Sequence, residues 1–327
     1  NMQTGYTQHP GPDGPINTKI HLETERRNSP ADQRGLIPFL TDELTGPNLG
    51  YVYPQGSRSS LNYGGNLEVS PPHSVNGRNF PFGRLVYGGG SGGLLEGNQY
   101  TDRMNDNQLS LLNAQQIQGP ALEVSSEWLA VGHIDEIFLF LKNNAEGNSP
   151  WVVVLASPSL ARQKLQQAYE LGYGQTVLFQ GRGQYETTVE SILSNSYLMG
   201  FNELAQTRID SIRQVLQTNL GLSTDDFIEV PVLYENYDGS GLAVALNPGV
   251  QNLVAADSVL FVPDPEGPMI DGEDIWKSAT LDALAPLGYE VRFVDVFYSY
   301  HVLMGEAHCG TNFEREPSST PWWEVEE

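Results

Sequence analysis

Apolar residues from position 151 onward recur with the spacings of alternating strands and helices. Residues 151–157, WVVVLAS, are apolar almost throughout and predict a buried strand. Residues 158–172 begin with proline, which favours the first turn of a helix, and 175–181 predict a second strand. Over about 186–220 the apolar positions are mostly three or four residues apart, as on one face of a long helix.

The same alternation continues toward the end of the chain. Strands are predicted at 227–235, 258–265 and 289–298, and a helix at 272–288. The first hundred residues are instead rich in Gly, Pro, Asn and Ser, which is typical of short strands joined by long loops. No low-complexity linker divides the chain, so we expect residues 1–327 to form a single α/β domain with mixed sheets.

The chain is strongly acidic. Its 40 Asp and Glu residues against 17 Lys and Arg give a formal net charge of −23. This charge disfavours nucleic acid and anionic membranes and attracts cationic ligands. No apolar run approaches the roughly 20 residues of a membrane-spanning helix. We therefore expect neither nucleic acid nor a membrane as a partner.

Cys309 is the only cysteine in the chain and lies in the segment GEAHCGTN, 305–312. It cannot form an internal disulfide, and lone cysteines are more often inert than reactive. A nucleophilic thiol, with an ordinary pKa of about 8.5, needs a neighbour that stabilises the thiolate. Adjacent side chains on an extended segment point to opposite faces. We therefore expect the useful histidine to come from elsewhere than His308.

His133 has the most suggestive surroundings among the histidines, in WLAVGHIDEIFLFL, 128–141. On an extended segment, Asp135 would point to the same face as His133. The pair would then be a general acid–base group beside a carboxylate that orients it or holds a cation. The alternative is that His133 caps a helix that begins at EIFLFL, with Asp135 and Glu136 favouring its N-terminus. Spacing alone leaves both interpretations open.

Two other kinds of site find less support. Zinc sites usually contain close ligand pairs such as CxxC or HExxH, and the chain has neither. The Gly-rich segment 88–97 lacks both the GK[ST] ending of a phosphate loop and the GxGxxG spacing, so a surface loop is expected there. The residues favour a cysteine hydrolase that uses Cys309 and His133 on a cationic substrate.

Several motifs resemble the catalytic domain of the peptidyl-arginine deiminases. The longest are GNLEVSPP at 65–72, WLAVGHIDE at 128–136 and YHVLMGEAHCGTN at 300–312. Shorter matches lie at 34–36, 46–52, 113–120, 267–272 and 321–323, and all are in the family's order. The resemblance implies the pentein fold, a five-bladed α/β propeller in which five ββαβ modules surround a central active-site cleft.

The resemblance also implies a reaction, the hydrolysis of peptidyl-arginine to peptidyl-citrulline and ammonia. Cys309 would attack the guanidinium carbon. His133 would protonate the departing ammonia and then activate water against the thiouronium intermediate. Asp135 would hold the guanidinium through paired hydrogen bonds. Arg34 matches the family arginine that contacts the substrate backbone, which implies arginine-containing peptides or proteins as substrates.

Some positions depart from the family pattern. A second guanidinium-binding aspartate falls immediately before Asn1, so we expect an upstream fragment of the same precursor to stay bound and supply it. Larger family members carry immunoglobulin-like domains upstream, which these residues do not include. Leu303 stands where some members have an arginine at the substrate entrance, so we expect a different sequence preference.

Calcium is a candidate cofactor, because family members use it to order the active site. Glu68 and the carbonyl of Leu67 match family ligands. The early ligand positions, however, are Asn1 and Gln3, and a later acidic position falls near Asn28, so amides replace three carboxylates. Fewer charged oxygens lower the affinity for a hard cation. We expect weak or absent calcium dependence.

Two further functions stay open on the sequence alone. A relative that lacks the upstream aspartate would bind arginine peptides without releasing ammonia. A free-arginine deiminase or an amidinotransferase would use the same fold, although Arg34 and the long collinear match argue against it. Scarce lysine with abundant Asn, Gly and Ser leans toward an exported, extracellular protein.

Overall fold

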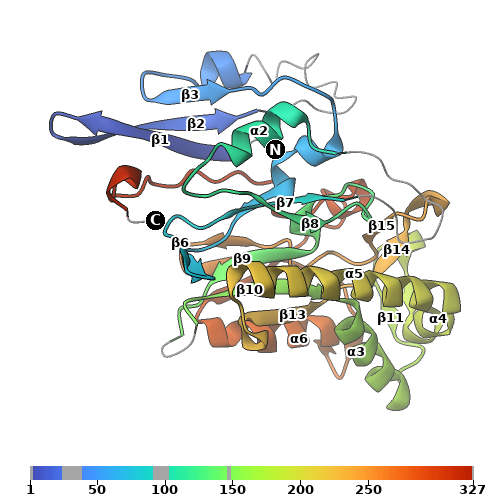
Figure 1. The fold of residues 1–327 in the computed structure, drawn as a ribbon. Helices are drawn as coiled ribbons and strands as arrows, with labels where there is room; N and C mark the ends of the chain where they lie inside the picture. The colour runs from blue at the N-terminus through green and yellow to red at the C-terminus, as the bar shows by residue number, and fades with distance from the viewer. Residues whose placement is uncertain (1–2, 24–38, 91–102, 146–148, 326–327) are drawn as a thin grey trace.

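Small mixed sheets with helical segments beside them make up the part of the chain that the computed structural model describes, residues 3–23, 39–90, 103–145 and 149–325 (Figure 1). Three-stranded sheets recur there with one pairing pattern. The first strand pairs antiparallel with the second, and the second pairs in parallel with the third. They are formed by β1 (Gln3–Gly11), β2 (Gly14–Leu22) and β3 (Leu49–Val52); β4 (Leu67–Val69), β7 (Leu85–Gly89) and β8 (Leu122–Ser125); β9 (Phe138–Lys142), β10 (Trp151–Ser157) and β13 (Phe227–Pro231); and β16 (Val254–Ala256), β17 (Val259–Pro263) and β20 (Glu290–Val294). The mixed α/β class expected from the sequence is confirmed.

A helical segment lies between the second and third strand of each of these sheets. The segments are a short π-helix (Phe39–Glu43), α2 (Asp106–Asn113), the group α3 (Pro158–Glu170), α4 (Val189–Ser194) and α5 (Ser196–Leu220), and α6 (Ile275–Leu284). Parallel strands need such a crossover, because a tight turn can join only antiparallel neighbours. The order strand, strand, helix, strand is that of the expected ββαβ module. Closure of five modules into a propeller stays a prediction.

The remaining strands are short and pair antiparallel in twos. They are β5 (His73–Val75) with β6 (Arg78–Phe80), β11 (Val177–Leu178) with β12 (Thr187–Thr188), β14 (Tyr234–Asn236) with β15 (Ala243–Ala245), and β18 (Met269–Ile270) with β19 (Glu273–Asp274). The strand expected at 175–181 is therefore too long: Phe179 has a positive φ of 58°, which no extended strand adopts. The strand expected at 289–298 likewise ends at Val294, where the chain enters turns.

The helix expected over 186–220 is divided at Asn195. This residue has a non-helical ψ of 89°, and its side chain accepts a hydrogen bond from the backbone N–H of Leu198 at 3.0 Å. Asparagine favours this capping role over the helix interior, because its side chain satisfies an N–H that the first turn leaves free. Asn195 thus ends α4 and begins α5.

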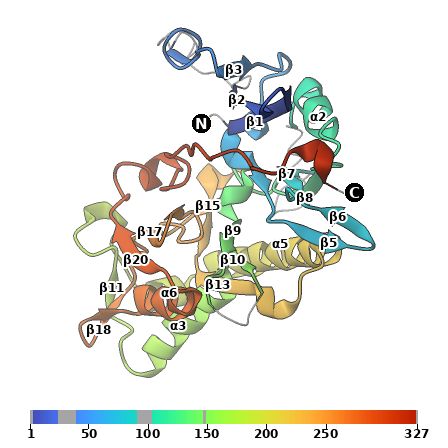
Figure 2. The ribbon, with the colours of Figure 1, turned by 90° about the vertical axis from the view of Figure 1, so that its left-hand side faces the viewer.

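The largest group of buried apolar side chains surrounds β10. Val153, Val154 and Leu155 are completely buried, and α5 packs against this group with Ile209 and Ile212. Figure 1 shows α5 in front of β10 and β13, and Figure 2 shows the sheet of β1–β3 at the top of the molecule, away from this core. The core therefore lies in the half of the chain whose periodicity was clearest in the sequence.

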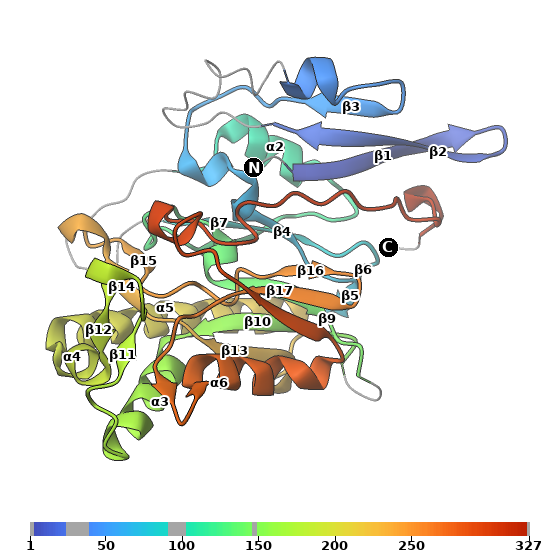
Figure 3. The same cartoon turned by 180° about the vertical axis from the view of Figure 1, so that it is seen from behind.

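The C-terminal segment runs beside β1, as Figure 3 shows from behind. The side chain of Gln8 donates to the carbonyl of Ser318 at 2.9 Å, and the indole N–H of Trp322 donates to the carbonyl of Gln8 at 3.2 Å. Thr4 bonds in the same way to the carbonyl of Phe313. The two ends of the described chain are thus packed together. Within the described ranges, no helix is long and apolar enough to cross a membrane.

Candidate active site

Cys309 lies in a turn at residues 307–310, after β20. Its Sγ atom lies 3.5 Å from Oδ2 of Asp135 and accepts a hydrogen bond from Nδ2 of Asn252 at 3.4 Å. Withdrawal of the sulfur from water, together with the negative charge of Asp135, holds the pKa of the Cys309 thiol well above its ordinary value. The thiol is therefore protonated in the free protein at neutral pH.

Asp135 is 1% exposed and lies at the centre of the group. Its Oδ2 atom accepts a hydrogen bond from Nδ1 of His308 at 3.0 Å and faces the thiol of Cys309. Its Oδ1 atom is buried and has no hydrogen-bond partner among the described residues. A buried carboxylate oxygen without a donor is costly, so this atom marks a place where a ligand with N–H groups would be favoured.

His133 begins a single 3-10 turn, Ile134–Glu136, rather than an extended segment. Its backbone N–H donates to the carboxylate of Glu136 at 2.8 Å, and its Nε2 atom lies 3.0 Å from the carbonyl of Ser60. The expectation of an extended segment was wrong at 134–136. The alternative, a helix capped by His133 with Asp135 and Glu136 at its N-terminus, is confirmed for this one turn. The helix does not continue through EIFLFL, because Phe138 begins strand β9.

The imidazole of His133 is 3% exposed, and burial lowers its pKa despite the charge of Asp135. A carbonyl only accepts hydrogen bonds, so contact with Ser60 places the proton of the neutral ring on Nε2 and leaves Nδ1 as an acceptor. A Cβ atom added to Gly65 would lie 2.8 Å from this Nδ1 and 2.7 Å from Oδ2 of Asp135. His133 and Asp135 therefore point to the same place, as predicted.

His308 belongs to this group, contrary to the expectation from the sequence. Residues 307–310 form turns rather than an extended strand, so the side chains of His308 and Cys309 both reach Oδ2 of Asp135. Burial opposes protonation of the imidazole, but the hydrogen bond to Asp135 and the charge of Glu68 outweigh it and raise the pKa of His308 to about 9. The ring is therefore cationic at neutral pH.

Asn252 joins the segments that carry Cys309 and Asp135, and the sequence interpretation missed it. The residue is 1% exposed, and its Oδ1 atom accepts hydrogen bonds from the backbone N–H groups of His308 at 2.9 Å and Cys309 at 3.2 Å. Its Nδ2 atom donates to the carbonyl of Asp135 at 3.0 Å and to Sγ. No motif marks Asn252, because its partners are 57 and 117 residues away in sequence.

A buried acid holds the other side of the Cys309 turn. One oxygen of Glu306 accepts from the backbone N–H of Gly249 at 3.1 Å and lies 2.7 Å from Nδ1 of His301. The carbonyl of Glu306 accepts from the N–H of Gly310 at 3.2 Å. Hydrogen bonds of Glu306 and Gly310, which are not candidate catalytic residues, therefore hold the turn on both sides of Cys309.

The sequence of the chain matches the family model described as Protein-arginine deiminase (PAD) over residues 1–324. The chain belongs to the protein-arginine deiminase family. It is 35% identical to mouse protein-arginine deiminase type-4, 36% to the rat type-3 enzyme and 34% to the human type-4 enzyme, in each case over 99% of this chain. The chain spans about half the length of these relatives, 47% of each.

Solved structures that align with this deiminase-family chain include agmatine deiminases of C. jejuni. One aligns with 94% of this chain and 69% of its own, at 13% identity and a TM-score of 0.45. A cysteine-to-serine variant with substrate bound aligns with 93% of this chain and 70% of its own, at 12% identity and a TM-score of 0.46.

The residues at the expected calcium position of this family member do not fit a cation. The carbonyl oxygens of Gly64 and Leu67 both accept hydrogen bonds from Nε2 of Gln3. The carboxylate of Glu68 instead lies 3.7 Å from Nε2 of His308. The N–H groups of Gln3 carry partial positive charge and occupy the point between these oxygens, so they would repel a cation there. The described ranges also hold no cluster of three or more His, Cys, Asp or Glu side chains suited to a metal ion.

Other positions named from the family pattern have different outcomes. Arg34, the expected substrate-backbone ligand, lies outside the described residues, as do Asn1 and Asn28. Leu303 lies at the end of a short 3-10 turn, His301–Leu303, and is 72% exposed. It is therefore available to a large partner at the surface, while its role in sequence preference stays a prediction.

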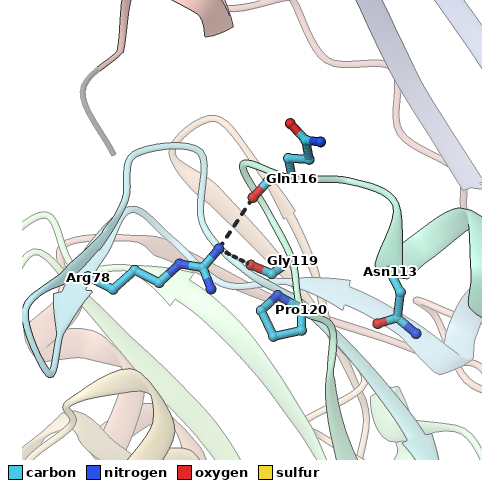
Figure 4. Close-up of a pocket in the computed structure, with 5 residues that line it drawn as sticks. All are labelled: Arg78, Asn113, Gln116, Gly119 and Pro120. Atoms are coloured by element: carbon cyan, nitrogen blue, oxygen red, sulfur yellow. Dashed lines mark hydrogen bonds between the residues drawn. The ribbon is translucent and has the colours of Figure 1, made fainter.

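A hollow of about 340 Å³ lies elsewhere on this deiminase-family chain (Figure 4). Arg78 lines it and donates to the carbonyl of Gly119 at 2.7 Å and to that of Gln116 at 3.4 Å. Its other lining residues are Asn113 and Pro120. The hollow shares no residue with the group around Cys309, so it takes no part in the candidate active site.

Proposed function

We propose that this chain hydrolyses peptidyl-arginine to peptidyl-citrulline and ammonia. The observation that carries the proposal is the unpartnered Oδ1 atom of Asp135, buried within the group that holds Cys309 and His133. A guanidinium is a planar cation with paired N–H donors that matches such a carboxylate. Membership of the protein-arginine deiminase family supports the same substrate class.

Substrate binding would activate the nucleophile. Asp135 holds the pKa of the Cys309 thiol high, and a guanidinium against Asp135 would offset that negative charge. The thiol would then lose its proton to Nδ1 of His133, the ring atom that the bond to Ser60 leaves as an acceptor. Binding of the cationic substrate and formation of the nucleophilic thiolate would thus be coupled.

The reaction would follow in two halves. Sγ of Cys309 forms a bond to the guanidinium carbon, one C–N bond breaks, and His133 gives its proton to the departing nitrogen, which leaves as ammonia. His133 then takes a proton from water as its oxygen attacks the thiouronium carbon. The S–C bond then breaks and the new hydroxyl group releases its proton to solvent, which leaves neutral citrulline and restores the thiolate. Asp135 holds the cation throughout.

Two structural features belong to the same proposal. The ββαβ sheets, together with the β14–β15 pair, would be blades of a five-bladed propeller around this site. A second carboxylate from outside residues 1–327 would hold the far side of the guanidinium. Intact mass and activity of the purified protein test the second feature: full activity of the 36.0 kDa chain alone would contradict it.

Ammonia release from a blocked arginine amide tests the function. We expect release by the wild-type protein and none by Cys309→Ser, with free arginine a much poorer substrate than the blocked amide. Binding of the amide without ammonia release would instead indicate an arginine-binding relative, and equal turnover of free arginine would indicate a free-arginine deiminase. Either result would overturn the proposal.

A further inference from the structure

The carboxamide of Gln3 connects the first strand to a distant turn. Nε2 of Gln3 donates to the carbonyl oxygen of Leu67 at 3.0 Å and also to that of Gly64, across 64 and 61 residues of sequence. An amide nitrogen carries two hydrogens, so each carbonyl has its own donor. The two contacts tie β1 to the turn that precedes β4.

That turn forms one wall of the candidate active site. It consists of the 3-10 segment Gly64–Asn66 and the start of β4, and Gly65 faces His133 and Asp135 so closely that a Cβ atom would lie within 2.8 Å of both. Within the same turn, Nδ2 of Asn66 donates to the carbonyl of Gly88 at 2.8 Å. Gln3 therefore connects the turn to β1, and Asn66 connects it to β7.

Carbonyl oxygens that converge on one point beside a carboxylate are typical ligands of a hard divalent cation. Here that point is occupied by the amide of Gln3, which supplies two donors and no net charge. The next carboxylate, Glu68, faces His308 at 3.7 Å instead. Gln3 thus provides hydrogen bonds to the two carbonyl oxygens, and His308 lies beside the Glu68 carboxylate, without a metal ion.

We infer that the Gln3 amide occupies the position of a divalent cation, so that the Gly64–Leu67 turn keeps its geometry without calcium. Gln3 is then a positioning residue, which acts on His133 and Asp135 through Gly65. The effect on activity rests on the proposed function. The effect on stability and on cation binding does not.

The variant Gln3→Glu tests this inference. It removes both N–H donors and places a carboxylate against two carbonyl oxygens, which creates the charge and ligand set that a cation needs. We expect the wild-type protein to melt at the same temperature in chelator and in about 1 mM calcium. Gln3→Glu should melt lower in chelator, by about 3 °C or more, and calcium should restore most of the loss.

Gln8→Glu is the matched control. Gln8 lies on the same strand, is 5% exposed, and donates through the same type of amide to one carbonyl, that of Ser318. We expect Gln8→Glu to lose stability without recovering it in calcium, because a single carbonyl makes no cation site. Gln3→Met, which removes the donors without adding charge, should also stay lowered in calcium.

Calorimetric titration with calcium measures binding directly, apart from any activity. We expect saturable binding by Gln3→Glu that the wild-type protein lacks. A wild-type melting temperature that rises with calcium, or equal calcium responses of Gln3→Glu and Gln8→Glu, would overturn the inference. If Gln3→Glu fails to fold in any condition, calcium titration of the wild type and of Gln3→Met tests the inference instead. Saturable calcium binding by either protein would contradict the inference. An absence of ammonia release from the wild-type protein would refute the proposed function alone.

Discussion

Nδ1 of His308 lies 3.0 Å from Oδ2 of Asp135, the carboxylate oxygen that Sγ of Cys309 also approaches. One oxygen thus faces an imidazolium and a thiol from adjacent residues of a turn. The cation lowers the electrostatic cost of burying Asp135, while the carboxylate keeps the thiol protonated. Asp135 therefore influences the charge of both neighbours before any substrate binds.

The stability of the protein should depend on pH through His308. Its pKa is about 9 in the folded protein against about 6.5 in an unfolded chain, because Asp135 and Glu68 favour the cation despite burial and the nearby Arg315. A raised pKa gives stability that is fully present below pH 6.5 and is lost as pH rises through 9. The contribution is at most about 3 kcal/mol.

Urea unfolding of the wild type and His308→Gln at several pH values checks this expectation. The wild type should be more stable at pH 6, and the difference should shrink as the pH approaches 9.5. A difference that stays constant with pH would mean that His308 acts only by packing. Substitution of His9, an exposed histidine in β1, should leave the pH dependence of the stability unchanged.

Asp135→Asn should make the thiol more reactive while it removes turnover of arginine. The negative charge of Asp135 raises the pKa of Cys309, so its loss should increase the thiolate fraction, by roughly tenfold for each unit that the pKa falls. The rate of alkylation by neutral iodoacetamide, followed by mass at the only cysteine, measures this directly. Asp226→Asn, in a capped turn elsewhere, should leave the rate unchanged. Slower alkylation of Asp135→Asn would show that the carboxylate does not control the thiol.

Asn252→Asp should have the opposite effect on the thiol. The new side chain still accepts from the backbone N–H groups of His308 and Cys309, but it can no longer donate to Sγ or to the carbonyl of Asp135, and it adds a negative charge. Loss of buried hydrogen bonds of about 1–3 kcal/mol corresponds to roughly 5- to 150-fold in rate. We expect ammonia release to fall by about that factor and alkylation to slow. Faster alkylation would contradict this role.

Regular elements were predictable where the apolar spacing was strong. β10, α3 and α6 lie where the pattern placed them, because continuous apolar runs and three-to-four-residue spacing reflect burial directly. The division at Asn195 was missed, since the apolar spacing continues across it and only a side-chain cap separates α4 from α5. A periodic pattern reports which faces are buried, and it does not report such local breaks.

The candidate site was predictable only in part, for a related reason. Cys309, His133 and Asp135 stood out through residue type and the family motifs. His308 was excluded on the assumption of an extended backbone, and the turn at 307–310 reverses that conclusion. Asn252 could not be found, because its role depends on bringing together segments more than 50 residues apart. Tertiary contacts of uncharged side chains leave little trace in a single sequence.

Gly65→Ala should lower activity about 100-fold in a protein that still folds. The added Cβ atom would lie 2.7 Å from Oδ2 of Asp135 and 2.8 Å from Nδ1 of His133, well inside contact distance, so both side chains must move away from the place where the guanidinium is proposed to bind. A misplacement of about 1 Å at reacting groups can cost about 100-fold in turnover. Gly46→Ala is the matched control, because its Cβ atom would meet nothing within 4 Å. Ammonia release and thermal unfolding of both variants check the expectation. Full activity of Gly65→Ala, with unchanged Michaelis constant, would show that the Gly64–Leu67 turn does not shape the site.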